Sequence, residues 1–276
     1  MSTIVGDIML KTLSLFLFIW YLTISSLLAQ QEREPLPFDF GEELHFEVSY
    51  GWLNLADAKL VIHKRPQKIN EREHFKIDIY GKTKGAATLF GKVNDNWGTI
   101  LDKENILPSQ SYRHIEEGNY RKHEVVNFDQ KNKAAEVTLF DKANKNIKDV
   151  KTIDLPNQVQ DIVSGFYFLR TKNLENLSEG DSIQIRGFFD EEIYNINLIY
   201  EGIQQIETVL GIQSTYVFSP KIPKNKLFRG DYPIKVWVSR DMNKIPLKIK
   251  ANLFLGSLNL DLVSAKGIKN DPLTSN

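Results

Sequence analysis

The spacing of apolar residues predicts a chain built mainly of short β-strands. After Gly41, Leu44, Phe46 and Val48 alternate with polar residues, as expected for a strand with one buried face. Similar segments follow at 53–62, 75–79, 94–101, 110–115, 125–128, 135–140, 183–188, 193–200, 205–209, 215–218, 234–238, 247–251 and 258–262. An irregularity is expected near Ala56. Short strands separated by turn residues are typical of antiparallel sandwiches and barrels, and we expect about fourteen to sixteen of them.

One segment has a different period and predicts a helix over 157–174. Its apolar residues are spaced by three and four: Val159, Ile162, Val163, Phe166, Leu169 and Leu174. This spacing gives one apolar face. Pro156 and Asn157 supply start signals, and Asp161 would lie in the first turn, where the helix dipole favours an acid. The fold class expected is mainly β, an antiparallel curved sheet or incomplete β-barrel with one principal amphipathic helix packed against or plugging it.

The N-terminus has the pattern of a secretory signal peptide. Lys11 precedes an apolar run over 13–28, and Ala29 provides a small residue at a cleavage point. The alternative is a membrane anchor, but about sixteen apolar residues are short of the ~20 that span a bilayer. We expect cleavage near Ala29, with Met1 or Met9 as the first residue, and location in the periplasm or outside the cell.

The rest of the chain is expected to form one domain. After the signal peptide (1–29) we expect an extended lead-in (30–40), a single β domain (41–268) and a C-terminal tail (269–276), because no low-complexity linker interrupts the strands. The chain has no Cys. It therefore has no cysteine to acylate and no disulfide, so the mature protein is expected to be not lipidated and to be held by packing alone. After signal cleavage it is also expected to be without an integral membrane span.

Four segments, taken in order, resemble a known family. They are Gly41–Leu44, Gln160–Arg170, Val236–Pro246 and Leu255–Leu258. This set resembles the DUF3108 family, bacterial envelope proteins of unknown function, over essentially the whole mature chain. The resemblance implies an antiparallel β-barrel-like or strongly curved sheet in a periplasmic setting. It carries over no catalytic residues.

The sequence offers no catalytic motif. There is no Gly-x-Ser-x-Gly elbow, no phosphate-binding glycine loop and no Cys nucleophile. The five histidines lack metal-site spacing, and because three of them sit at polar positions of strands, solvated strand faces are expected. The acidic runs Glu116–Glu117 and Asp190–Glu192 are expected to be hairpin-turn charge, because adjacent strand residues point to opposite faces. We therefore predict no catalytic residues, no metal and no cofactor.

A basic loop is the first candidate binding site. It carries four cations with apolar residues between them: Lys221, Lys224, Lys226 and Arg229. It could contact anionic head groups, a glycan or a partner protein, or it could be a solvated loop. Over the whole chain 35 basic residues balance 35 acidic ones. This balance argues against nucleic acid as a partner and gives no bulk attraction to an anionic membrane.

Two further candidates lie elsewhere. Arg170 is surrounded by apolar residues on the predicted helix, so it must be paired if it is buried. We expect a carboxylate or carbonyls of the sheet as its partner, with a ligand anion as the alternative. Leu89 and Phe90 lie in a segment bounded by glycines. They could form a short apolar lid over a barrel mouth, or a loop tucked onto the core.

These observations favour a non-enzymatic periplasmic envelope protein. It would bind a lipidic or other amphiphilic ligand, or a partner protein in outer-membrane maintenance. One alternative is a hydrolase acting on envelope polymers, with carboxylates that converge only in the fold. The other is a structural scaffold that binds proteins along a sheet edge.

Overall fold

A computed structural model describes residues 35–89, 91–143, 146–221 and 229–270. The chain divides into two compact units, Met1–Leu36 and Pro37–Asn276. The predicted signal peptide, the first part of the lead-in and residues 271–276 of the tail lie outside the described residues. The architecture below is that of the second unit.

Sixteen strands make one sheet within the described part of this unit. The first nine are β1 (Glu43–Tyr50), β2 (Leu53–Ile62), β3 (Gln67–Ile69), β4 (Arg72–Thr83), β5 (Asn94–Asp102), β6 (Pro108–Glu117), β7 (Tyr120–Asp129), β8 (Ala134–Phe140) and β9 (Ile147–Asp154). The others are β10 (Val159–Gln160), β11 (Ser182–Phe189), β12 (Glu192–Thr208), β13 (Gly211–Pro220), β14 (Ile234–Ser239), β15 (Pro246–Asn252) and β16 (Ser257–Lys266).

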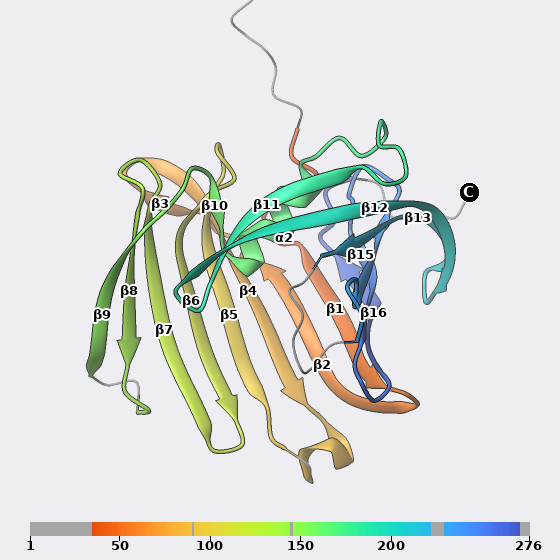
Figure 1. The fold of residues 1–276 in the computed structure, drawn as a ribbon, viewed down its shortest axis with the longest axis horizontal. Coiled ribbons are helices and arrows are strands. Elements are labelled where there is room, and N and C mark those ends of the chain that lie inside the picture. The colour runs from red at the N-terminus through yellow and green to blue at the C-terminus, as the bar shows by residue number, and fades with distance from the viewer. Residues whose placement is uncertain (1–34, 90, 144–145, 222–228, 271–276) are drawn as a thin grey trace, which may run out of the picture. The chain divides into compact units, whose positions relative to one another are not determined.

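The sheet consists of two meanders joined at one seam. Its order is β10-β11-β12-β13-β14-β15-β16-β1-β2-β4-β5-β6-β7-β8-β9, with β3 paired to β4 outside this path. Neighbours are antiparallel except β10 and β11. The seam pairs β1 with β16, from Glu43 opposite Lys266 to Tyr50 opposite Leu258. Strands β9 and β10, which are consecutive in the chain, end the sheet at its two edges, so the sheet is not closed (Figure 1).

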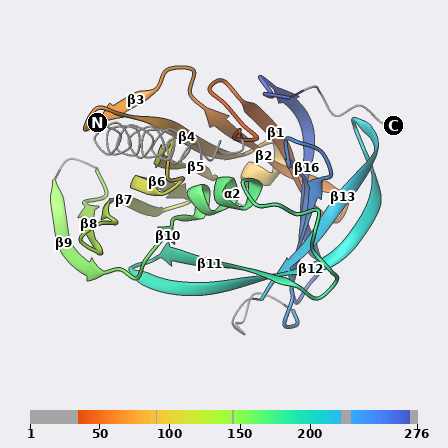
Figure 2. The same cartoon turned by 90° about the horizontal axis from the view of Figure 1, so that it is seen from above.

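The sheet curls around helix α2 (Ile162–Arg170), as Figure 2 shows from above. The predicted class is confirmed: the fold is mostly β, with a large curved sheet that does not close and a single α-helix among the described residues. Leu169 of the helix belongs to an apolar cluster with residues of β11 to β14 that include Ile185 and Phe218. No helix in the described ranges is both long and apolar enough to cross a lipid bilayer.

The strand prediction was correct wherever one face of a strand is buried. The irregularity expected near Ala56 is present: Val48 pairs with Ala56 and Ser49 with Asn54, so Leu55 is left over. Strands β3, β9 and β10 were not predicted. Strand β9 is exposed along almost its whole length. It therefore lacks the alternation of apolar and polar residues that burial of one face imposes.

The helix is shorter than predicted and presents a different face. Residues 159–160 form β10, which pairs with Arg186–Gly187 of β11, and the helix begins only after Asp161. Asp161 is its N-cap and accepts hydrogen bonds from the Val163 and Ser164 amides, which satisfies two free donors of the first turn. Ile162, predicted to be on the apolar face, is exposed, whereas Tyr167 is fully buried.

A buried ion pair joins the helix to the start of β1. The Arg170 guanidinium lies 2.6 Å from Glu42 Oε1 (Nη1) and 2.8 Å from Glu42 Oε2 (Nη2), and the two residues are 1% and 0% exposed. Arg170 Nε donates to the Asn243 carbonyl at 3.0 Å. The prediction that Arg170 pairs with a carboxylate or carbonyls is confirmed. The Phe38 ring stacks edge-on against Tyr167 beside this pair, so part of the lead-in contributes to the core.

Candidate functional site

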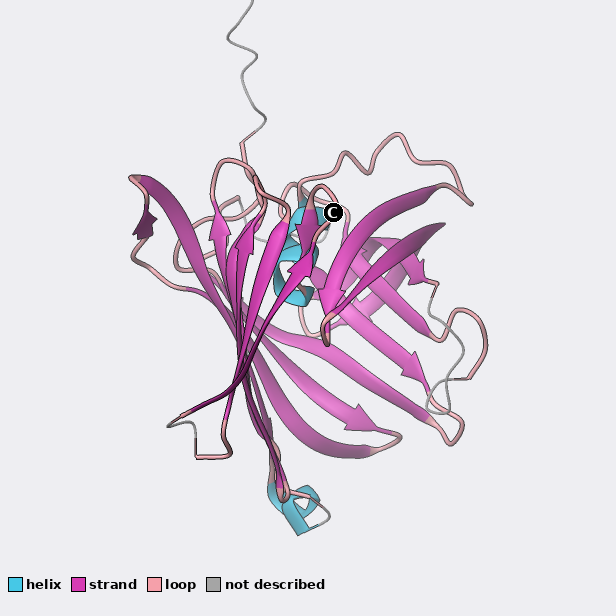
Figure 3. Ribbon diagram, turned by 60° about the vertical axis from the view of Figure 1, so that its left-hand side comes forward, coloured by secondary structure: helices cyan, strands magenta, loops and turns pink. Residues whose placement is uncertain are grey.

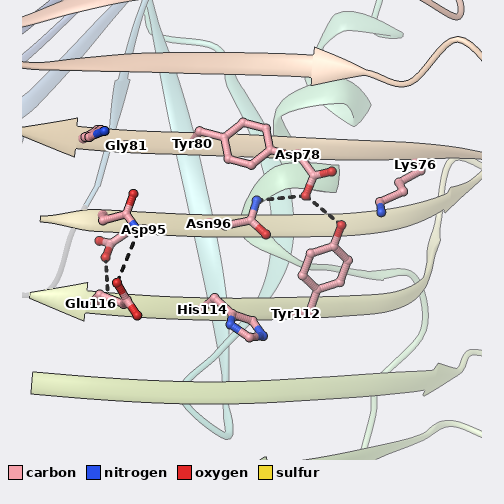
Figure 4. Close-up of a pocket in the computed structure, with 11 residues that line it drawn as sticks. Lys76, Asp78, Tyr80, Gly81, Asp95, Asn96, Tyr112, His114 and Glu116 are labelled. Atoms are coloured by element: carbon pink, nitrogen blue, oxygen red, sulfur yellow. Dashed lines mark hydrogen bonds between the residues drawn. The ribbon is translucent and has the colours of Figure 1, made fainter. Parts of the chain in front are cut away.

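A polar groove lies over strands β4, β5 and β6, on the face opposite the helix. On β4, Phe75 and Ile77 point inward and are fully buried. Thr99 of β5 pairs with Ile77, and its hydroxyl donates to Asp161 at the helix N-cap at 2.7 Å. Because successive side chains of a strand alternate, Asp78 and its even-numbered neighbours on β4 point to the other face. They line a hollow of about 670 Å³ (Figure 4).

Asp78 forms the centre of the groove and is only 2% exposed. Tyr112 donates its hydroxyl to Asp78 Oδ1 at 2.7 Å, and Asn96 donates its amide to the same oxygen at 2.9 Å. His63 Nε2 lies 2.6 Å from Asp78 Oδ2. Burial would raise the pKa of Asp78, but the hydrogen bonds from Asn96, Tyr112 and His63 outweigh it and hold this pKa below its ordinary value. The groove therefore holds a fixed negative charge at neutral pH.

Gly98, which has no side chain, makes room for Tyr112 to reach Asp78. A Cβ on Gly98 would lie 2.1 Å from Tyr112 Cζ, so the phenol ring occupies the space that any other residue at 98 would fill. Tyr112 thereby crosses the β5 backbone and reaches Asp78 on β4. Burial and the neighbouring Asp78 raise the pKa of Tyr112 far above its ordinary value, so Tyr112 remains a hydrogen-bond donor at all physiological pH values.

The walls of the groove carry donors, acceptors and aromatic rings. Lys76 supplies an ammonium 5.9 Å from the centre of the Tyr112 ring, and the Tyr80 ring is partly exposed. At the far end, Asn94 donates to Glu116 Oε2 at 3.2 Å. Figure 4 shows Lys76, Tyr80, Tyr112 and Glu116 on β4 and β6. Such a set can bind a ligand rich in hydroxyl groups, since each hydroxyl both donates and accepts.

Histidines border this face in an arrangement that was not predicted. His114 Nδ1 lies 2.8 Å from His123 Nδ1 across β6 and β7. Burial and the neighbouring His123 lower the pKa of His114. His74 and His123 are buried, so the prediction that the histidines lie on solvated faces is wrong for these two. No group of three or more metal-binding side chains occurs within the residues that the structure describes.

The acidic runs are at hairpin turns, as predicted, but one of them also bonds to the sheet interior. Glu116–Glu117 ends β6, and Asp190 lies in the turn between β11 and β12. Asp190 Oδ1 is 2.7 Å from Arg113 and 2.6 Å from Lys122. Arg113 is buried, and its guanidinium lies 5.2 Å from the centre of the Trp97 ring and 4.8 Å from the centre of the Phe189 ring. These contacts fasten the second meander to the first.

Those residues singled out from the sequence that the structure describes do not line the groove. Arg170 is buried and forms a salt bridge with Glu42, so a ligand anion would have to displace Glu42. Leu89 ends the short 3-10 helix η1 (Gly85–Leu89), is 85% exposed and lies at the far end of the strands from α2 (Figure 3). Lys221 and Arg229 are exposed. Phe90, Lys224 and Lys226 lie outside the described residues.

The groove residues were not predicted because their positions along the sequence look like those of ordinary strand residues. Lys76, Asp78 and Tyr80 occupy the polar positions of an alternating strand, which is also the pattern of an ordinary solvated face. What distinguishes Asp78 is the approach of Asn96 and Tyr112 from two other strands. The glycine at 98 was the available clue, because glycine inside a strand often marks a close approach.

A large curved sheet that stays open and wraps around one helix defines a β-barrel-like fold. The family model described as a protein of unknown function, DUF3108, matches residues 45–263, and the chain belongs to this family. No curated protein matches the chain.

Solved structures align with the chain at low sequence identity. A β-barrel-like protein of the DUF1849 domain family from Brucella abortus aligns with a TM-score of 0.54 and 10% identity, over 83% of this chain and 98% of that one. The hypothetical protein CT021 from Chlamydia trachomatis aligns with a TM-score of 0.38 and 9% identity, over 87% of this chain and 94% of that one. The first of these supports the β-barrel-like fold.

Proposed function

We propose that this chain is a non-enzymatic binding protein of the bacterial cell envelope. Its ligand is hydroxyl-rich, a sugar carried either by an envelope glycolipid or by a free glycan. The signal-peptide pattern around Lys11 and Ala29 supports the location, and the groove on β4–β6 supports the ligand. The observation that carries the proposal is Asp78, which is buried yet held as an anion by three neighbours at the base of a hollow of about 670 Å³.

The volume and chemistry of the groove fit this ligand class. Small-molecule sites usually measure about 300–1,000 Å³. The lining combines the Lys76 ammonium, the Asn96 amide and the faces of two tyrosine rings. Polar groups of this kind bond sugar hydroxyls, and aromatic faces cover the apolar face of a sugar ring. An acyl chain would displace water from the Lys76 ammonium and offer it no hydrogen bond, so it would remain outside the groove.

Hydrolysis of the same ligand is the second candidate, and the groove favours it less. A general acid needs a pKa near the working pH, whereas hydrogen bonding lowers the pKa of Asp78. One feature supports the candidate: burial and the nearby Asp95 raise the pKa of Glu117. Asp95 lines the end of the groove. If these carboxyl groups hydrolyse the ligand, the cleaved sugar will be detected during the binding titration.

The test is calorimetric titration of the protein, in the form that the cell produces, with chitooligosaccharides and with deacylated lipopolysaccharide core. Tyr80→Ala removes an exposed ring of the groove and should weaken binding by about tenfold or more. Tyr120→Ala is the matched control, because Tyr120 is also exposed but lies outside the groove lining. Equal loss in both variants, or binding of neither probe, contradicts the proposal. Release of new reducing ends supports the hydrolase.

A further inference from the structure

Two hairpin tips lie side by side at one end of the sheet, apart from the groove. One is the turn between β1 and β2, and the other is the turn between β15 and β16 (Figure 1). The β1–β16 seam brings them together, with Tyr50 opposite Leu258. The Tyr50 hydroxyl donates to the Leu255 carbonyl across the two tips. We refer to residues 50–56 and 252–258 as the paired tips.

The paired tips are uncharged and apolar. Their sequences are Tyr-Gly-Trp-Leu-Asn-Leu-Ala and Asn-Leu-Phe-Leu-Gly-Ser-Leu, without one charged residue in a chain that is 25% charged. The large side chains point into solvent: Trp52 is 88% exposed, Leu255 81% and Phe254 59%. A cluster of exposed apolar side chains on neighbouring turns is the kind of surface that marks a contact site.

The local backbone fixes these side chains in an outward position. Gly51 and Gly256 have positive φ values of 60° and 79°, which tight turns require and which other residues rarely adopt. The Tyr50 ring fills the space beside Gly256, where a Cβ would lie 2.9 Å from its Cζ. The two turns therefore support one another, and Trp52, Phe254 and Leu255 are left exposed to solvent at this end of the sheet.

A cation lies at the base of the second tip. The backbone amide of Arg229 donates to the Asn252 carbonyl at 3.0 Å, and Arg229 is exposed. Tryptophan and tyrosine favour the boundary between lipid and water. Apolar side chains beside a basic residue are typical of proteins that lie on a membrane, because the cation meets the anionic head groups.

We propose that the paired tips insert into the interface of a phospholipid bilayer. Trp52, Phe254 and Leu255 enter the boundary between head groups and acyl chains, and Arg229 contacts lipid phosphate. The protein thereby binds a membrane from one side, without a spanning segment from this unit. An exposed tryptophan beside an exposed cation on an otherwise uncharged surface suits a bilayer, where the ring lies at the boundary between lipid and water and the cation meets lipid phosphate. This proposal is independent of the groove.

The test is sedimentation with vesicles of phosphatidylethanolamine and phosphatidylglycerol, and with phosphatidylcholine vesicles. The protein is used in the form that the cell produces, with its N-terminus determined by intact mass. The double variant Trp52→Ser/Leu255→Ser should bind more than about tenfold more weakly. Val209→Ser is the control, because Val209 is 66% exposed at the separate β12–β13 turn. Arg229→Gln should weaken binding only to the anionic vesicles.

A second measurement separates insertion from adsorption at the lipid surface. Brominated lipids quench a tryptophan that enters the bilayer, so quenching should be lost in a Trp52→Phe variant. Unchanged sedimentation of the double variant overturns the proposal, as does the absence of vesicle binding by the parent protein. Self-association without lipid that the double variant abolishes would also overturn it, because a second copy of the chain would then cover the tips.

Discussion

Replacing Glu42 with Gln should destabilise the protein by about 3–5 kcal/mol, because it leaves a buried guanidinium without its counter-charge. Glu42 and Arg170 are almost wholly excluded from solvent and are joined by contacts of 2.6 and 2.8 Å. Gln keeps the shape of the side chain and one acceptor oxygen. Its amide nitrogen, however, takes the position of the second acceptor and faces a donor.

The remaining partners of Arg170 reduce the effect without removing it. Arg170 Nε bonds the Asn243 carbonyl at 3.0 Å, and Nη2 lies 3.4 Å from the Pro37 carbonyl. These carbonyls carry no net charge, so we expect a value near the lower end, about 3 kcal/mol. The double variant Glu42→Leu/Arg170→Met removes both charges and should be more stable than the sum of the two single changes implies.

The assay is urea denaturation followed by tryptophan fluorescence and circular dichroism, with the midpoint expected to fall by about 1 M or more. Glu47→Gln is the control, since its pair with Lys84 at 2.8 Å is about one-third exposed. That change should cost less than about 1 kcal/mol. Equal effects of Glu42→Gln and Glu47→Gln would refute the argument that burial gives the first pair its weight.

Three further changes test other parts of the fold. Asp161→Ala should cost about 1–2 kcal/mol in denaturation experiments, because it removes the helix cap. Asp161→Asn should be nearly neutral at pH 7, because the amide keeps the cap and burial raises the pKa of the carboxyl that it replaces. Equal losses of stability in the two variants would contradict this. Gly98→Ala should displace Tyr112 and lower the melting temperature, while Gly81→Ala, with open space at its Cβ, should not; similar melting curves would argue against the close approach. The pKa of Asp78 is lowered from 3.8 in the folded state, so its contribution to stability is present above about pH 4 and is lost as the pH falls below that value. Asp78→Asn should therefore flatten the acid-unfolding curve measured by circular dichroism, and an unchanged slope would count against the three-donor arrangement.

The sequence predicts the fold wherever burial leaves a periodic pattern. On β4 the core-facing residues repeat every second position, at Phe75 and Ile77, and Ile185 of β11 also faces the core. Strand β9 carries its apolar residues Ile147 and Val150 in solvent. Ile153 alone among its apolar residues is partly buried against the core, so the conformation of β9 depends mainly on pairing with β8, and such pairing leaves no mark in the sequence of one strand.

The helix boundary and the groove depended on contacts between distant residues. Val159 continues the three-and-four spacing of the helix, yet it lies in β10 and pairs with Arg186 of β11. The helix starts two residues later, at the Asp161 cap. Asp78 resembles a solvated strand residue until Asn96 and Tyr112 approach it from β5 and β6. Arg170 was different: a lone cation among apolar neighbours requires a partner, so the kind of partner could be predicted although Glu42 could not.

The seam between β1 and β16 determines how the chain can fold as it is made. The first meander can form from local hairpins as it emerges, but β1 remains an open edge until β16, the C-terminal strand of the described chain, arrives. During that interval the backbone donors and acceptors of Glu43–Tyr50 are available to any other strand. A nascent chain that stalls before residue 257 would expose both this edge and the adjacent β2 tip. Such a partly made molecule is the form in which this protein is most prone to pair with its own copies.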